Sequence, residues 1–526
     1  MKKRTAVAAL IIAVSLSTSG IGRAQPKEQL GKVDFPNSCS PAVQEQFQRS
    51  VAMLHSFRYG EGEKAFREVL AQDPSCAIAT WGIAALLMSN PLAGVGSSKE
   101  GAERAQAAID QGRKIGAKTP REQRYIDAVA AYYEDWANRP ERTRQLNRAK
   151  AFQALAERYP DDDEAQIFAA LYIAATQSQA DQSYKAYLMA AEVLEKEFAK
   201  HPDHPGVAHY LIHSYDAPPI AAKGLTAARR YASIAPAAPH ALHMPSHIFT
   251  RVGAWTESIE TNGRSAVAAK RENDGDEQAH AMDYMVYAYL QLARDADAQR
   301  VIEESAQLGR VVRFAAPYAL AAMPARYAAE RGDWPAATKL TPRPSAFPFT
   351  EALTHFARGV GAARTGDAAT AEKEGLELTR LRDALKTAKS EYWANEVEVN
   401  RLGVAAWTAL AQGKQDEALA LMRNAADVED RNEKHIVTPG RILPARELLG
   451  DMLLQLKRPA DALKEFETVQ AREPERFRTY HGAAQAAAQS GDKAKARRYF
   501  AKLVELAGEG TRPEIAQARA FLAANP

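Results

Sequence analysis

Two short phrases near the C-terminal end decide the fold: Lys457-Arg458-Pro459-Ala460-Asp461-Ala462 and Gly491-Asp492-Lys493-Ala494-Lys495-Ala496. Their first residues stand 34 positions apart, and Phe466 and Phe500 repeat that offset. Self-similarity at a period of 20 to 50 residues is the mark of a repeat architecture. The same phrase, a turn residue with an alanine five positions later, begins at Gly332, Gly366 and Gly413.

The phrase predicts two antiparallel helices joined by a tight turn. The glycine ends the first helix, and the small alanine lets the second helix pack closely against it. One such hairpin cannot bury its own apolar face, so neighbouring hairpins must stack. The chain is alanine-rich, only 8% of its residues are aromatic, and strand patterns are absent. We therefore expect an all-α protein of stacked helical hairpins.

The period also carries a family resemblance. Three further features occur with the 34-residue period: a small residue on the second helix, a later aromatic residue, and a proline after that helix (Pro74, Pro474). In these features the chain resembles the tetratricopeptide repeat (TPR) family. The resemblance implies a right-handed superhelical solenoid whose concave groove takes a protein or peptide ligand.

The sequence also predicts a division of the chain. We expect a signal peptide at 1–24, an N-terminal extension at 25–40, degenerate TPR-like repeats at 41–340 and better preserved repeats at 346–526. The break at 341–345 contains Pro342 and Pro344, which oppose helix formation.

The first 24 residues have the pattern of a secretory signal. Lys2, Lys3 and Arg4 precede an apolar run, and Gly22 and Ala24 fit a cleavage site before Gln25. The apolar run is too short for a stable membrane anchor, which needs about 20 residues. We therefore expect a periplasmic or secreted protein.

Net charge gives no indication of a polyanionic partner. The whole chain has a formal net charge of +3, and four positive charges lie in the signal segment, so the rest carries −1. A nearly neutral chain lacks the excess of positive charge that is typical of proteins that bind nucleic acid.

Cys39 and Cys76 are the only two cysteines. Export places them where disulfides persist, so we expect them to pair around the first predicted hairpin. Two separate buried thiols are the alternative, and no CxxC spacing supports a metal site.

Histidines are unusually concentrated: seven of the twelve lie between positions 201 and 247. His209 and His213 are four residues apart, as are His243 and His247, so each pair shares one face of a helix. His240 stands three residues before His243. Converging imidazoles suit zinc or copper, or nickel, and Tyr215, Asp216 or His280 could complete the set. The candidate metal ligands are His209, His213, His240, His243 and His247.

A structural role for these histidines is the alternative. Pro245 interrupts the run from His240 to His247, so His240 and His243 are also compatible with a loop that caps the next helix. His201 and His204 lie in a proline-rich turn and fit solvated positions. The cluster would then be a packed polar network that holds degenerate repeats together.

The run from Pro239 to Ile248, with its HxxHMPSH pattern, resembles a motif of exported bacterial TPR proteins. That group shares the paired cysteines and a segment like His209 to His213. The resemblance supports fold and compartment and assigns no activity.

Two classes of function follow. The first is a TPR scaffold that binds a protein or peptide in its groove, with a histidine metal site as an additional feature. The second is a metal-dependent enzyme, hydrolase-like, that uses the histidines. No HExxH, GxSxG or GxxxxGK[ST] signature occurs, so the sequence leaves catalysis open. The candidate groove residues are Tyr284, Arg326, Asn395, Asn400 and Glu447.

Overall fold

The computed structural model describes residues 28–508 and 510–525, and these residues form helices and loops without a strand. The predicted signal peptide, 1–24, and the first residues of the predicted extension lie outside the described residues. In the described part, no helix combines the length and the apolar character that crossing a bilayer requires.

The N-terminal half of the described chain contains fourteen α-helices and two short 3-10 helices, at 41–43 and 221–224. The α-helices are α1 Gln44–His55, α2 Tyr59–Gln72, α3 Ala79–Leu87, α4 Lys99–Ile115, α5 Pro120–Tyr133, α6 Glu141–Arg158, α7 Asp163–Ala174, α8 Lys185–Lys200, α9 Pro205–Ser214, α10 Leu225–Ile234, α11 Pro239–His243, α12 Pro245–Val252, α13 Trp255–Arg271 and α14 Gly275–Gln291.

The C-terminal half continues the series. Its helices are α15 Asp295–Ser305, α16 Ala315–Glu330, α17 Trp334–Ala337, α18 Pro348–Arg364, α19 Ala368–Thr387, α20 Glu391–Ala411, α21 Gln415–Asp430, α22 Ala445–Gln455, α23 Pro459–Arg472, α24 Phe477–Gln489, α25 Lys493–Ala507 and α26 Pro513–Ala524.

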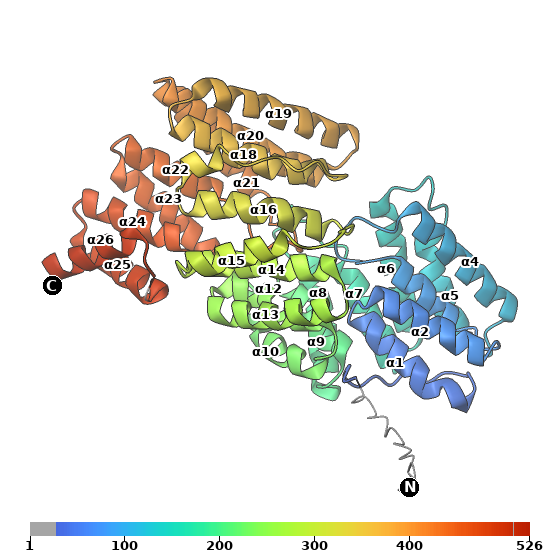
Figure 1. Ribbon diagram of the computed structural model, residues 1–526. Coiled ribbons are helices and arrows are strands. Elements are labelled where there is room, and N and C mark those ends of the chain that lie inside the picture. The colour runs from blue at the N-terminus through green and yellow to red at the C-terminus, as the bar shows by residue number, and fades with distance from the viewer. Residues whose placement is uncertain (1–27, 509, 526) are drawn as a thin grey trace, which may run out of the picture.

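Successive helices pack as antiparallel hairpins that stack one on the next (Figure 1). The close approach between helices depends on small residues. On α22 and α24, Gly450 and Gly482 both lie against the ring of Phe466 on α23, and Gly82 on α3 lies against Phe66 on α2. The predicted all-α fold of TPR-like helical hairpins is confirmed.

The turns of the repeated phrase have one backbone form. Gly491 has φ of 85° and Gly366 has φ of 88°, in the left-handed region that ends a helix. The next residue then caps the following helix: the carboxylate of Asp492 accepts the N–H of Lys495. Lys457 occupies the same slot with φ of 59°, so the geometry persists where glycine is absent.

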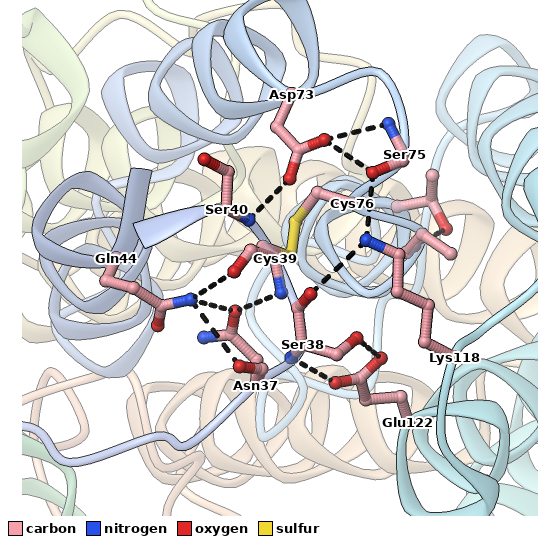
Figure 2. The surroundings of a disulfide bond; sticks show 12 residues. Asn37, Ser38, Cys39, Ser40, Gln44, Asp73, Ser75, Cys76, Lys118 and Glu122 are labelled. Carbon is pink, nitrogen blue, oxygen red and sulfur yellow. Dashed lines mark hydrogen bonds between the residues drawn. A yellow bond between two sulfur atoms is a disulfide. The ribbon is translucent and has the colours of Figure 1, made fainter. Parts of the chain in front are cut away.

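Cys39 and Cys76 form the predicted disulfide, which joins the extended N-terminal segment to the loop before α3 (Figure 2). The carboxylate of Asp73 accepts hydrogen bonds from the backbone N–H of Ser40 and from Ser75 beside the bridge. These hydrogen bonds lower the pKa of the Asp73 carboxyl. The bridge and the hydrogen bonds together attach the N-terminal segment to α2 and α3.

The C-terminal hairpins fold back on the middle of the chain. Arg476, fully buried before α24, donates to Glu330 of α16 at 2.8 Å and to Glu447 of α22 at 3.2 Å. Its Nη1 also donates to the hydroxyl of Tyr287 on α14 at 2.7 Å. The contacts bring repeats from two parts of the chain into one packed body.

A loop without helix passes through the interior of this stack. We call residues 432–443, between α21 and α22, the inner segment; eleven of its twelve residues are buried and Arg441 is half-buried. Glu433 N–H donates to the carbonyl of Gln179 at 2.8 Å, and the hydroxyl of Tyr284 donates to the carbonyl of Val437 at 3.4 Å. A buried loop needs partners for its polar backbone, and the inner faces of several hairpins supply them.

Candidate metal centre

Six histidines meet where α9, α11, α12 and α14 pack together. They form two groups in which one ring nitrogen of each member lies within 4.8 Å of the others. Group A consists of His209, His213 and His240, and group B of His243, His247 and His280. All six side chains are buried. The five predicted ligands therefore come together, and His280 completes the set.

Local sequence explains the placement. His209 and His213 lie one turn apart on α9, which begins at Pro205. Pro239 begins the short helix α11 and Pro245 begins α12, so two helical turns follow each other with a change of direction. His240 and His243 thus lie on a helix; the alternative that placed them in a capping loop is wrong.

In group A the ring nitrogens divide into two sets. Nδ1 of His209 donates to the carbonyl of His55 at 2.7 Å, and Nδ1 of His240 donates to the carboxylate of Glu277 at 3.3 Å. The Nε2 atoms of both rings, and both nitrogens of His213, are buried without a hydrogen-bond partner among the described residues. Buried polar atoms without partners are rare and require an explanation.

In group B the tautomers are fixed by oxygen acceptors. Nδ1 of His243 donates to the side-chain oxygen of Asn262 at 2.7 Å, since the amide nitrogen of Asn262 donates to Ser258. Nδ1 of His247 donates to the carboxylate of Asp216 at 2.9 Å. The two Nε2 atoms then face each other at 3.0 Å. Both carry a lone pair there, so they repel unless a cation lies between them.

The protonation of these rings agrees with this assignment. Burial lowers the pKa of His209, His213 and His243 well below the ordinary value, and neighbouring imidazoles lower it further. Burial lowers the pKa of His280 to about 3. Neutral imidazoles are the form that binds metal.

Groups A and B are neighbours. The rings of His213 and His247 are 5.5 Å apart between centres, and those of His240 and His243 are 5.9 Å apart. His55, Glu277, Asn262 and Asp216 accept hydrogen bonds from these rings, the arrangement by which oxygen acceptors orient histidines in metal sites.

The carboxylates behind the histidines have cationic partners. Asp216 pairs with Arg251 at 2.7 Å and with Lys434 of the inner segment at 3.6 Å. Glu277 lies 3.7 Å from Arg313, which also pairs with Asp274 at 2.5 Å and with Asp276 at 3.7 Å. The pKa of Asp216 is low: burial opposes this, and Lys434 and Arg251 outweigh burial.

A cleft of about 710 Å³ reaches the cluster from one side. His240 of group A and His280 of group B both line it, as does Glu277. The aromatic side chains of Tyr59 and Phe314 form part of its wall. One member of each group therefore borders the same cleft.

Other residues singled out in the sequence lie elsewhere. His201 is half-buried and pairs with Asp163 at 2.6 Å. His204 is buried and pairs with Glu164 at 2.9 Å, so its predicted solvated position is wrong. Tyr215 bonds to Glu195 and is not part of the cluster.

The candidate groove residues divide into two sets. Tyr284 and Arg326 are buried against the inner segment, where Arg326 donates to the carbonyl of Gly440 at 2.9 Å. Glu447 is buried and accepts from Arg476. Asn395 and Asn400 are half-buried on α20.

Sequence reasoning missed two parts of the site. Glu277 lies on α14, 37 residues after His240, and only its spacing of three from His280 offered a signal. The inner segment gave no periodic pattern, although its Pro439-Gly440 pair opposes helix.

Comparisons with known proteins add little. No protein-family profile and no curated protein matches the chain. Among solved structures, a tetratricopeptide repeat protein from Parabacteroides merdae ATCC 43184 is 15% identical, with a TM-score of 0.29, covering 54% of this chain and 97% of its own. The APC/C hetero-tetramer Cut9-Hcn1 is 11% identical, with a TM-score of 0.30, covering 92% of this chain and 96% of that one. At such TM-scores the fold assignment depends on the repeats of this chain itself.

Proposed function

We propose that this protein is a TPR-like scaffold that holds transition-metal ions, zinc or copper, in two trihistidine sites. The observation that carries the proposal is the pair of Nε2 atoms in group B, 3.0 Å apart with both Nδ1 atoms donating to oxygen. A bound cation removes the repulsion between the two lone pairs. The unpartnered Nε2 atoms of His209 and His240 support a second ion in group A.

Three nitrogen ligands per ion leave coordination positions open. Structural zinc sites have four protein ligands, whereas catalytic sites keep a position for water or substrate. The cleft lined by His240 and His280 gives a route to those positions. This observation favours the second candidate function, a metal-dependent enzyme, over a purely structural centre.

Export belongs to the same proposal. The signal-like segment 1–24 and the disulfide between Cys39 and Cys76 are consistent with a periplasmic or secreted protein.

A protein or peptide partner is a further part of the proposed scaffold function. The inner segment already occupies the space beside Tyr284 and Arg326. A groove ligand must therefore displace it or bind along α20, where Asn395 and Asn400 are half-buried.

The test is metal content, measured by mass spectrometry on full-length protein exported to a periplasm and purified without a histidine tag. We expect about two ions per chain, because each trihistidine group supplies a ligand set. His247→Ala and His209→Ala should each lose about one ion. His481→Ala, whose ring pairs with Gln517 outside both groups, should keep both.

Metal-free parent protein that gains no zinc or copper when either is added would overturn the proposal. Circular dichroism on each variant distinguishes a lost ligand from a lost fold.

A further inference from the structure

We infer that groups A and B form one dinuclear copper centre whose shared open side takes dioxygen. The inference rests on the proposed metal function and adds the identity of the metal, the coupling of the two ions and the class of ligand. Three observations carry it: the chemistry of the ligand atoms, the charge balance around them, and the position of the cleft.

The ligand atoms are all imidazole nitrogens. Six neutral donors surround the two positions, with no carboxylate oxygen among the atoms of either group. Nitrogen donors bind copper(II) more strongly than the other divalent first-row ions. Oxygen-preferring ions such as magnesium, calcium and manganese do not suit this set.

Charge then favours the reduced form of copper. Asp216 is paired with Arg251 and Lys434, whereas Arg313 is shared by Asp274, Asp276 and Glu277. None of these carboxylates is among the ligand atoms, so two divalent ions would place four positive charges against six neutral imidazoles, which is costly in a low dielectric. Two copper(I) ions carry half that charge and repel each other four times less at a given distance.

The two groups border one space. His240 belongs to group A, His280 belongs to group B, and both line the same cleft. The ring centres of His240 in group A and His243 in group B are 5.9 Å apart. A small molecule that enters the cleft therefore meets both ions together.

Dioxygen fits this arrangement because it can accept one electron from each ion. Each copper(I) is oxidised to copper(II), and dioxygen takes the two electrons to become bound peroxide, with the O–O bond retained and no proton transferred. The reaction needs no further reactant. The peroxide dianion supplies the negative charge that the protein ligands lack.

The experiment uses the full chain, stripped of metal and loaded with copper(I) without oxygen. Copper content is measured first, then dioxygen consumption and the electron paramagnetic resonance (EPR) spectrum after air is admitted. We expect two copper ions per chain, one dioxygen consumed for each pair, and no EPR signal from the oxygenated form because the two copper(II) spins couple.

His280→Ala tests the shared centre, and His481→Ala, whose ring pairs with Gln517, is its matched control. We expect His280→Ala to keep one copper, to lose the dioxygen stoichiometry and to show the EPR signal of an isolated copper(II) once oxidised. His481→Ala should behave as the parent. If His280→Ala fails to fold by circular dichroism, the EPR spectrum of the oxygenated parent decides alone.

The outcomes separate the two proposals. Parent protein that binds no copper and no zinc overturns the proposed function and this inference together. Parent protein that binds metal but gives two uncoupled copper(II) signals per chain, or consumes no dioxygen, overturns this inference and leaves the metal function standing.

Discussion

Single oxygen acceptors determine which nitrogen each cluster histidine presents. The carbonyl of His55 and the side chains of Asn262 and Asp216 accept from Nδ1 of three rings, and this leaves Nε2 of each ring for a ligand. Such partners orient the ring and raise its basicity. The tautomer of each histidine therefore determines which ring nitrogen is available to a ligand.

Asn262→Ala tests this role. Loss of the acceptor frees the ring of His243 to rotate and to change tautomer, and we expect metal affinity to fall about 10- to 100-fold. Competition with a chelator of known affinity measures the change. Asn400→Ala, on α20 and away from the cluster, is the matched control and should bind as the parent does. Equal affinity in both variants would contradict the assigned role.

The disulfide gives a second prediction for single residues. Cys39 and Cys76 are 37 positions apart in sequence. Replacing both by serine should lower the free energy of unfolding by about 3 to 4 kcal/mol, because the unfolded chain regains the entropy of that loop. Urea unfolding of parent and variant measures it. A loss below about 1 kcal/mol would show that the hydrogen bonds at Asp73 suffice to hold the N-terminal segment against α2 and α3 without the disulfide.

Glu429 gives a pH-dependent prediction. Burial raises the pKa of Glu429 to about 7, from an ordinary 4.5, although Arg441 lies 3.3 Å away. The folded protein then binds a proton that the unfolded chain has lost, so stability from this group falls as pH rises from 4.5 to 7. In Glu429→Gln that fall should be absent, a difference of up to about 1.4 kcal/mol per pH unit. Unfolding curves across this range compare the slopes, and parallel slopes would refute the prediction.

The close packing of some helix pairs depends on a glycine that leaves room for an aromatic ring of the neighbouring helix. A Cβ at Gly482 would overlap the ring of Phe466, which packs between α22 and α24. The phenylalanine is fully buried, so it has little freedom to move aside.

Gly482→Ala should therefore destabilise the C-terminal hairpins by about 1 to 3 kcal/mol. Gly375→Ala is the control, since a Cβ there meets only Val404 at 3.9 Å. It should stabilise α19 by about 0.5 to 1 kcal/mol through helix propensity. Thermal unfolding compares the two, and the same sign for both would rule out the proposed close approach.

These elements were predictable because their signals are local. The repeated phrase specifies turn, cap and close packing within six residues, and the spacing of His209 and His213 places both on one face of α9. Glu277 and the inner segment were not predictable in this way. His435 of that segment contacts the carbonyl of Ala93, 342 positions earlier, and no short pattern encodes such a contact.

For the molecule as a whole, buried ion pairs join the C-terminal repeats to the middle. Arg476 and its partners Glu330 and Glu447 are all nearly or fully inaccessible to solvent. Removal of one member of such a group leaves a buried charge without compensation.

Arg476→Ala should lower the free energy of unfolding by about 3 to 5 kcal/mol. Arg300→Ala, whose side chain is 66% exposed and pairs with Asp297, should change it by less than about 1 kcal/mol. Denaturant unfolding followed by circular dichroism measures both. Equal losses would mean that the contact between the two parts of the chain contributes little.

The inner segment also has a consequence for the order of assembly. Synthesis completes the six histidines at residue 280, well before residues 432–443 exist. Since N-terminal parts of a chain fold first, the cluster passes through a stage in which Tyr284 and Asp216 still lack Val437 and Lys434 as neighbours. During that interval the side of the cluster that the segment later covers is open. In the proposed metal function, the order of the sequence therefore lets ions enter from that side before the inner segment closes over it.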